Sequence, residues 1–307
     1  MKPKPLLGAE DVLGEGDTRL VLDLLPDELR GDSIFARLRE EVAWETMCHR
    51  GGEVPRLVAV QGAIEEDGRF PVYRHPSDQS PALRPFTPAV DLVRRHAESI
   101  LGHSLNHALI QLYRGGKDYI SEHSDKTIDV MHGTSIANVS FGARRIMVLR
   151  RKKSAALRGH RDGSNAISRG VPGPPRESQR IALPDNSMLL MGLRTNAAWL
   201  HAVHRDNRPD RAKAPEEAGE RISLTFRCIG TFLSADGKDI FGQGARGKTR
   251  EDARPVISVG EAEKAACRNE ADELLEAFRR ENCECDFDWQ GNYGRGFDLL
   301  HFAANNG

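Results

Sequence analysis

Apolar and polar positions alternate with different periods along this 307-residue chain and divide it into four regions. Residues 1–53 carry apolar side chains at amphipathic helical spacing, notably in Ile34–Leu38, and are predicted to form an N-terminal helical extension. Residues 54–104 begin with short strand-like runs and end in a predicted helix, Pro85–Leu101. This second region is expected to form a lid over one side of the core.

Residues 105–232 show the most regular β pattern, with apolar runs such as Ala108–Tyr113 that predict core strands. A stretch rich in Gly, Pro, Ser and Arg at 158–180 is predicted to be a loop inserted between core strands. Residues 233–307 change pattern again and are predicted to form a C-terminal extension that includes a charged helix. The chain is therefore expected to be mainly β with flanking helices (α+β), with a double-stranded β-helix (jelly-roll) core at 105–232.

Three residues of the β-rich region could bind a metal together. His123 and Asp125 are two positions apart, so on an extended segment their side chains share a face. His201 follows at the end of a second apolar run, and His204 is an alternative to it. Two imidazoles and one carboxylate on one face of a metal leave positions open for a cosubstrate and dioxygen, as in non-haem Fe(II) oxygenases.

A later segment, Arg221–Arg227, has the pattern of a strand with one polar and one apolar face. Its polar face carries Arg221, Ser223, Thr225 and Arg227. Two guanidinium groups aligned on one face require a dianion. 2-Oxoglutarate has two carboxylates that can pair with them in a bidentate manner.

The order of these residues resembles the AlkB-type Fe(II)/2-oxoglutarate dioxygenases. The resemblance covers residues 54–232, well over half of the chain. The matching segments include Ala108–Tyr113, Ser140–Arg145 and Trp199–His201. It implies Fe(II) as the metal, 2-oxoglutarate and O2 as cosubstrates, and succinate and CO2 as products. By the family's Trp-x-His pattern, His201 rather than His204 completes the metal site.

The resemblance also assigns a 2-oxoglutarate site. It places Tyr113, Arg221 and Ser223 near the far carboxylate, and it places Gln111 and Arg227 nearer the metal-bound end. The family usually has Asn where this chain has Gln111, a longer amide that can still donate a hydrogen bond.

Two substrate classes remain open. AlkB relatives that repair nucleic acid act on a flipped base. They have an acidic residue, which helps to read the base edge, where this chain has Thr127. Phe70 and Tyr73 lie where such relatives keep stacking residues in the lid. A small nitrogen-containing substrate such as an amino acid, as in fungal AlkB-like enzymes of secondary metabolism, is favoured. Oxidative demethylation of N-alkylated nucleobases in DNA or RNA is the alternative.

The C-terminal tail bears on this choice. Leu300 and Phe302 are two apart and would face one way on an extended segment. They could line the substrate pocket, or they could only dock the tail on the core. A catalytically inactive binding module is disfavoured, because the triad and both arginines are intact.

Composition and charge limit the partners. The net charge is −1 and the sequence pI is about 6.8, whereas proteins that bind duplexes usually carry a basic surface. A basic run at 144–153 is interpreted as a solvated strand end and loop. The charge balance therefore favours a small-molecule partner without excluding nucleic acid.

The cysteine content and the hydropathy of the chain indicate the cellular compartment. Five cysteines without a disulfide spacing predict reduced thiols, and Cys283-Glu284-Cys285 is a weak candidate for a metal site because it has no second pair nearby. No apolar run is long enough to span a membrane, and the first residues lack a signal-peptide core. An intracellular, soluble protein of the cytoplasm or nucleus is expected, while the pattern gives no indication of oligomeric state.

Overall fold

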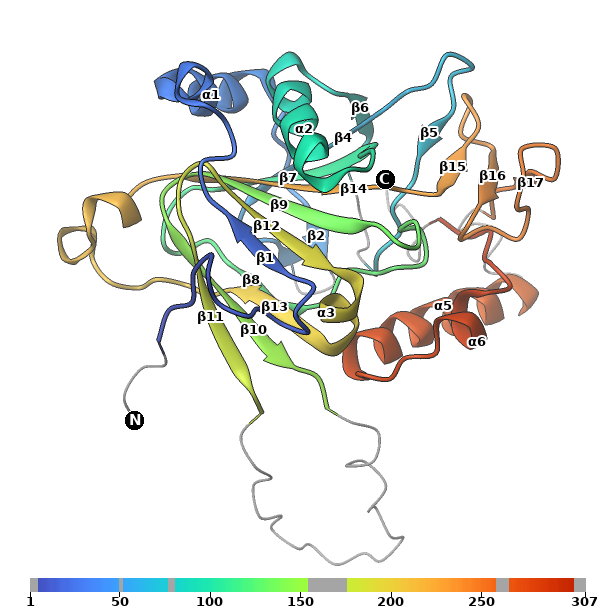
Figure 1. Ribbon diagram of the computed structural model, residues 1–307. Coiled ribbons are helices and arrows are strands. Elements are labelled where there is room, and N and C mark those ends of the chain that lie inside the picture. The colour runs from blue at the N-terminus through green and yellow to red at the C-terminus, as the bar shows by residue number, and fades with distance from the viewer. Residues whose placement is uncertain (1–4, 50–51, 77–80, 154–175, 258–264, 301–307) are drawn as a thin grey trace, which may run out of the picture.

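The computed structural model describes residues 5–49, 52–76, 81–153, 176–257 and 265–300. At its centre two β-sheets pack together (Figure 1). The larger sheet has the strand order β1-β12-β9-β14-β7-β4-β6, and the smaller has the order β11-β10-β13-β8. These packed, mainly antiparallel sheets confirm the predicted mainly β fold with a jelly-roll core.

The strands have the following bounds. The larger sheet contains β1 (Arg19–Val21), β4 (Leu57–Gly62), β6 (Leu83–Pro85), β7 (His107–Tyr113), β9 (Ser135–Gly142), β12 (Ser187–Gly192) and β14 (Arg221–Arg227). The smaller contains β8 (Ile120–His123), β10 (Arg145–Arg151), β11 (Ser178–Leu183) and β13 (Trp199–Val203). A third sheet contains β5 (Phe70–Pro71), β15 (Thr231–Leu233), β16 (Asp239–Gly242) and β17 (Arg254–Pro255), and β2 (Cys48–His49) pairs with β3 (Gly52–Glu53).

The central strand β14 is buried along its whole length. Its apolar and polar side chains alternate, so that they face two different environments. Ile222, Leu224 and Phe226 belong to the largest hydrophobic core, together with residues of the two covering helices. The polar positions of the same strand point to the opposite side, into the space between the two sheets. The two-residue period of this strand therefore separates the core from the candidate site.

Two helices cover the outer face of the larger sheet, α1 (Asp27–Glu41) and α2 (Pro88–Leu101), as Figure 1 shows. The helix predicted at Pro85–Leu101 is thus present with a slightly later start. It ends at Gly102, whose φ of 74° is the left-handed conformation that glycine adopts most readily. No helix within the described ranges is both long enough and apolar enough to cross a membrane.

The N-terminal region is less helical than the sequence pattern predicts. Besides α1, it contributes β1, which pairs with β12 at the edge of the larger sheet. Leu13 and Leu20 pack between the sheets together with Trp199. A three-residue edge strand depends on pairing with a distant segment, so local periodicity does not reveal it.

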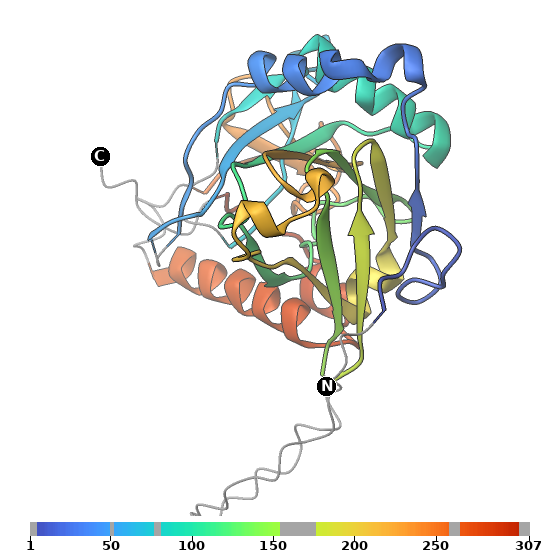
Figure 2. The ribbon, with the colours of Figure 1, turned by 90° about the vertical axis from the view of Figure 1, so that its left-hand side faces the viewer.

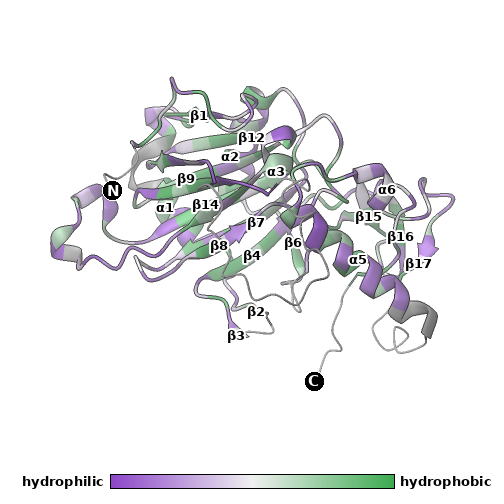
Figure 3. Cartoon of the chain, turned by 90° about the horizontal axis from the view of Figure 1, so that it is seen from below, coloured by the Kyte–Doolittle hydropathy of each residue, from purple (hydrophilic) through white to green (hydrophobic). Residues whose placement is uncertain are grey.

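The C-terminal region extends the core. Its strands β15, β16 and β17 form a sheet with β5 of the predicted lid. The helices α5 (Ala265–Cys283) and α6 (Trp289–Tyr293) lie on the other side of the β-core from α1 and α2 (Figures 1 and 2). The core strands are largely hydrophobic, whereas α5 shows much hydrophilic surface (Figure 3). Its buried side chains Leu274, Ala277 and Phe278 pack against Ile128 and the residues around α6.

The loop predicted at 158–180 falls mostly outside the described residues. Its last positions, from Ser178 onward, belong to β11. The predicted C-terminal extension contains β16, which pairs with β15 on one side and with β17 on the other.

A buried ion pair joins the lid, the core and the C-terminal region. The Arg74 guanidinium donates to both carboxylate oxygens of Asp129, at 2.6 to 3.2 Å. It also donates to the carbonyl oxygens of Gly244 (2.8 Å) and Phe297 (2.6 Å). Both charged side chains are almost fully buried, so each depends on the other for charge compensation.

Replacing Arg74 should destabilise the whole protein. Arg74→Met leaves the Asp129 carboxylate buried without its partner, so the free energy of unfolding is expected to fall by roughly 3–5 kcal/mol. Urea denaturation followed by circular dichroism measures this loss. Arg37→Met is the matched control, because the Arg37–Glu41 pair lies on the surface of α1 and its loss should cost less than about 1 kcal/mol. Equal losses in both variants would contradict the assigned role of Arg74.

Candidate active site

The three predicted metal ligands lie together between the sheets. His123 ends β8 and His201 lies in β13, and these two residues are direct partners across the antiparallel pair. Asp125 follows β8 by two residues. One ligand atom from each of the three side chains lies within 4.8 Å of the others. His204, the alternative ligand, is exposed and does not belong to this group.

The ring orientations suit metal binding. His123 Nδ1 lies 2.8 Å from the backbone oxygen of Ser121, so this nitrogen carries the hydrogen and leaves Nε2 free for a metal. His201 Nε2 lies 3.8 Å from a carboxylate oxygen of Asp125. Burial lowers the pKa of His201 to about 4, so the imidazole is neutral at physiological pH. Two neutral imidazoles and a carboxylate fit Fe(II).

Asp125 is oriented by Arg227, whose Nε donates to a carboxylate oxygen at 2.8 Å and whose Nη2 forms an ion pair with the same oxygen at 2.8 Å. Burial is the largest single effect and would raise the pKa of Asp125, but the charge and hydrogen bond of Arg227 together with His201 and His123 lower it to about 2. Arg227 itself is stacked on the Tyr73 ring, with its central carbon 4.0 Å from the ring centre. Arg227 thus makes a direct contact with a metal ligand, besides the role near 2-oxoglutarate that the sequence predicts.

An inner chamber behind the triad is lined by the residues predicted for 2-oxoglutarate. Arg221 lies directly across the β7–β14 pair from Tyr113, and Ser223 lies across from Gln111. The guanidinium lies over the Tyr113 ring at 5.1 Å, and the Tyr113 hydroxyl donates to Gln111 Oε1 at 3.1 Å. Strand register therefore brings all four predicted side chains to one place.

Arg221 is a buried cation that lacks an anionic partner among the described residues. Its side chain is 1% exposed, and only Nη2 makes a close hydrogen bond, to Ser140 Oγ at 2.8 Å. The Nε and Nη1 atoms have no partner within the described part of the chain. Burial lowers the pKa of Arg221 to about 10, which still leaves it charged at neutral pH. A carboxylate of a bound dianion would satisfy both the charge and the free N–H groups, so the chamber fits 2-oxoglutarate.

A larger outer cavity of about 620 Å³ opens on the other side of the triad. Tyr73, predicted as a substrate residue, lines it together with His75 and the metal ligands His123 and Asp125. Its opposite wall comes from α5, through Leu275, Phe278, Arg279, Asn282 and Cys283. The wall provided by α5 was not predicted, because contacts of a distant helix leave no local pattern.

The other predicted substrate residues lie elsewhere. Phe70 and Leu300 line a neighbouring hollow of about 320 Å³ and pack near Leu233, so Leu300 docks the chain end rather than lining the cavity at the triad. Thr127 lines neither cavity, and its hydroxyl donates to Glu281 at 2.5 Å. Phe302 lies outside the described residues. For Leu300 the predicted role in this pocket is therefore wrong, and the described residues of α5 form that wall instead.

The basic run at 144–153 is neither a solvated loop nor a free basic surface. Arg144, Arg150 and Arg151 form ion pairs with glutamates, the last two at 2.5 Å. The buried Arg145 donates to three backbone oxygens, and the buried Lys152 donates to the backbone oxygen of Glu281 at 2.7 Å. These cations are used within the fold.

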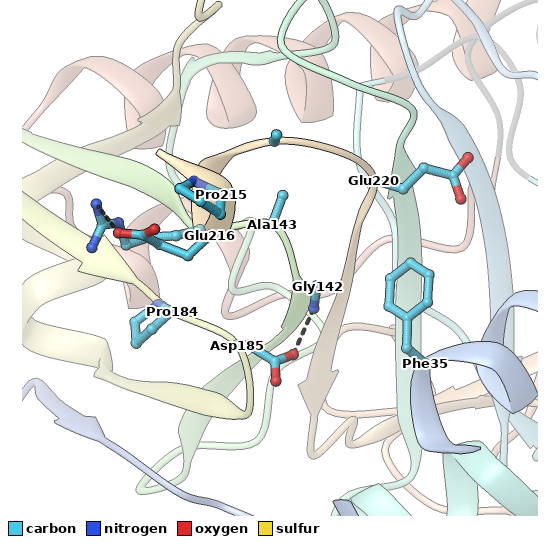
Figure 4. A pocket seen from close by; sticks show the side chains of 10 residues that line it. Phe35, Gly142, Ala143, Pro184, Asp185, Pro215, Glu216 and Glu220 are labelled. Atoms are coloured by element: carbon cyan, nitrogen blue, oxygen red, sulfur yellow. Dashed lines mark hydrogen bonds and ion pairs between the residues drawn. The ribbon is translucent and has the colours of Figure 1, made fainter. Parts of the chain in front are cut away.

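A third hollow, of about 590 Å³, lies elsewhere on the surface (Figure 4). Phe35, Gly142, Asp185 and Glu220 are among its lining residues, and Asp185 accepts a hydrogen bond from the Gly142 amide at 2.7 Å. It shares no lining residue with the cavity at the triad and contains no histidine or cysteine. It therefore offers no candidate for the chemistry.

Removing one ligand should weaken metal binding. His201→Ala removes one of three protein donors, so Mn(II) affinity, measured by electron paramagnetic resonance titration, is expected to fall by at least tenfold, or about 1.4 kcal/mol. His204→Ala is the control and should bind Mn(II) as the wild type does. Weak Mn(II) binding in His204→Ala with normal binding in His201→Ala would show that His204, rather than His201, is the ligand.

Arg221 should determine affinity for 2-oxoglutarate. Arg221→Lys replaces a planar fork with a point charge, and the loss of one charge-assisted hydrogen bond, about 1.5–3 kcal/mol, predicts a rise in Kd of roughly 10–150-fold. Calorimetric titration of 2-oxoglutarate into the Mn(II)-loaded protein measures this. Arg144→Lys, in a surface ion pair, should leave the Kd unchanged. A wild-type Kd in Arg221→Lys would place the cosubstrate elsewhere.

The chain was compared with protein families, curated sequences and solved structures. A family model described as the 2OG-Fe(II) oxygenase superfamily matches residues 18–227. The human DNA oxidative demethylase ALKBH2 is 31% identical over 205 residues, which cover 64% of this chain and 68% of that protein. The bovine alpha-ketoglutarate-dependent dioxygenase alkB homolog 3 is 27% identical over 66% of this chain and 63% of its own length. A solved structure of OsALKBH1 aligns with a TM-score of 0.40 and 16% identity over 69% of this chain and 98% of that chain.

The matched segment contains all three metal ligands and both arginines of the inner chamber. Members of this superfamily are oxidoreductases that use Fe(II), 2-oxoglutarate and O2. The chain therefore belongs to the 2OG-Fe(II) oxygenase superfamily and is an AlkB-like dioxygenase.

Proposed function

We propose that this dioxygenase demethylates N-alkylated nucleobases in nucleic acid. The human relative is a DNA oxidative demethylase, which supports this substrate class over the small nitrogen-containing substrate that the sequence favoured. The preference for a small amino acid and its link to fungal secondary metabolism have no support among the relatives. The small-substrate class therefore serves as the competing outcome of the test.

The shape and lining of the outer cavity carry the proposal. The cavity extends from His123 and Asp125 to the exposed residues Glu53 and Arg279, so it connects the triad with the surface. An enzyme for a free amino acid would be expected to enclose its substrate and exclude water. A cavity that opens to solvent admits a flipped base while the attached backbone stays outside.

Two planar rings line this cavity beside the triad. The Tyr73 and His75 rings lie 5.9 Å apart and both line the cavity. The Tyr73 hydroxyl accepts a hydrogen bond from the Lys126 amide at 3.0 Å, and its ring contacts the Arg227 guanidinium, so the ring is held in place. Fixed planar side chains suit the face of a base, because every base can stack on them.

The reaction divides between the bound groups and the protein. Fe(II), 2-oxoglutarate and O2 supply the oxidation of a C–H bond, with 2-oxoglutarate converted to succinate and CO2. Hydroxylation of an N-methyl group gives N–CH2OH, which releases formaldehyde and leaves N–H. The protein holds the far carboxylate of 2-oxoglutarate through Arg221, orients Asp125 through Arg227, and positions the base through Tyr73 and His75.

An activity comparison tests the substrate class. Purified protein with Fe(II), 2-oxoglutarate and ascorbate should remove one methyl group from a DNA oligonucleotide that carries a single N-methylated adenine or cytosine. Mass spectrometry should record the loss of CH2, with equimolar formaldehyde and succinate. His201→Ala should be inactive. Succinate formation stimulated by a free amino acid, with the oligonucleotide unchanged, would overturn the proposal.

A variant at the cavity wall refines the same test. Loss of one aromatic stacking partner costs about 1–3 kcal/mol, so His75→Ala is expected to raise the KM for the oligonucleotide by roughly 5–150-fold. Succinate formation without substrate should stay unchanged. Phe70→Leu is the control, because Phe70 lines the neighbouring hollow rather than this cavity. An equal rise in KM in both variants would show that the base does not bind beside His75.

A further inference from the structure

Residues 123–127, called the ligand segment below, contain the metal ligands His123 and Asp125. This segment has an unusual hydrogen-bonding pattern. β8 ends at His123, so the backbone of residues 124–127 lies outside any strand. Its four consecutive amide groups nevertheless all have acceptors, and each acceptor is a side chain from a distant part of the chain. Buried amides need such partners, since no backbone oxygen is placed to serve them.

Two of these acceptors come from the lid and the core. The Lys126 amide donates to the Tyr73 hydroxyl at 3.0 Å. The Asp125 amide donates to Asn196 Oδ1 at 2.9 Å, and Asn196 Nδ2 donates back to the Asp125 backbone oxygen at 3.0 Å. Asn196 is 1% exposed and lies in the short helix α3 (Leu193–Ala198). This pair of bonds fixes the backbone of the carboxylate ligand itself.

The other two acceptors lie on α5. The Ser124 amide donates to Asn282 Oδ1 at 2.9 Å, and the Ser124 hydroxyl and Lys126 Nζ reach the same oxygen at 3.4 and 3.3 Å. The Thr127 amide donates to Glu281 Oε1 at 2.9 Å. The second oxygen of Glu281 accepts from the Tyr293 hydroxyl at 2.8 Å, so the carboxylate is itself held in position.

We propose that Asn282 and Glu281 are positioning residues for the iron site, so that α5 is an integral part of the metal centre. Both lie beyond residues 18–227, the segment that matches the superfamily. Neither side chain is among the three candidate ligands. They act through the backbone on either side of Asp125, which sets the direction in which the His123 and Asp125 side chains point.

The direction of a ligand matters because metal affinity depends on preorganised donors. Residues that hold metal ligands in place typically change metal affinity by roughly 10–100-fold when they are removed. Asn282 gives the clearer test of the two. It accepts a hydrogen bond from Ser124, the residue between the two ligands, and it is uncharged. Its replacement therefore changes no net charge near the metal.

The experiment titrates Co(II) alone into the apoprotein and follows the visible absorption of the bound ion. Asn282→Leu, which has similar volume but no acceptor, should weaken Co(II) binding by roughly 10–100-fold and alter the absorption spectrum. Asn282→Asp keeps the acceptor oxygen and adds a negative charge that favours a cation, so it should bind Co(II) at least as tightly as the wild type does. Asn282→Ala carries the same expectation as Asn282→Leu and replaces it if the leucine variant does not fold.

A second variant distinguishes loss of ligand positioning from general destabilisation of α5. Leu274 is fully buried in the apolar cluster of α5, does not line the cavity, and has no polar side-chain group with which to hold a backbone amide. Leu274→Ala should lower the melting temperature of the apoprotein but retain wild-type Co(II) affinity at temperatures where it is folded. Wild-type affinity in folded Asn282→Leu would overturn the proposal. So would an equal loss of affinity in Leu274→Ala and Asn282→Leu.

This test does not depend on the substrate. Co(II) binding is measured without 2-oxoglutarate, O2 or nucleic acid. Failure of the protein to demethylate an oligonucleotide would therefore leave the positioning role untouched. Failure of Asn282→Leu to change Co(II) affinity would likewise leave the proposed substrate class untouched.

Discussion

The buried pair between Asp125 and Arg227 is the interaction on which the site depends. A carboxylate placed between two sheets is stable only with a compensating charge, and Arg227 supplies it from the end of β14. The same pair fixes the carboxylate for a metal and provides the surface against which Tyr73 stacks. Arg221, at the other end of the strand, is left without an anion among the described residues. Fe(II) and 2-oxoglutarate carry equal and opposite charges, so binding both fills the chamber without adding net charge.

The segment after β8 is where the regions of the chain meet. Tyr73 of the lid, Asn196 of α3 and two residues of α5 each accept one of its backbone amides. Further along, Asp129 pairs with Arg74, which also holds the carbonyl groups of Gly244 and Phe297. The lid and the C-terminal region are therefore tied to the ligand segment by specific polar contacts.

The basic run at 144–153 makes most of its polar contacts within the fold. The arginines of the basic run are paired with Glu15, Glu122 and the glutamates near 216, while Arg145 and Lys152 donate to backbone oxygens. Through these contacts they support the smaller sheet. A nucleic-acid substrate would consequently depend more on the cavity that receives the base than on long-range electrostatic attraction. Overall charge is thus a poor guide to the substrate of this protein.

The sequence by itself determined the β-rich core, the helix before it, the residues at the metal and the polar face of β14. These depend on local spacing: two residues per repeat in a strand, and a donor set whose chemistry suits one kind of metal. Only the tertiary structure decided that His123 and His201 face each other, that Leu300 lies beside a different hollow, and that α5 walls the cavity. It also decided that β1 joins the larger sheet and that Asn196 and Asn282 hold the ligand segment. Such contacts join residues far apart in the chain through register and helix docking, and neither leaves a periodic signal in the sequence.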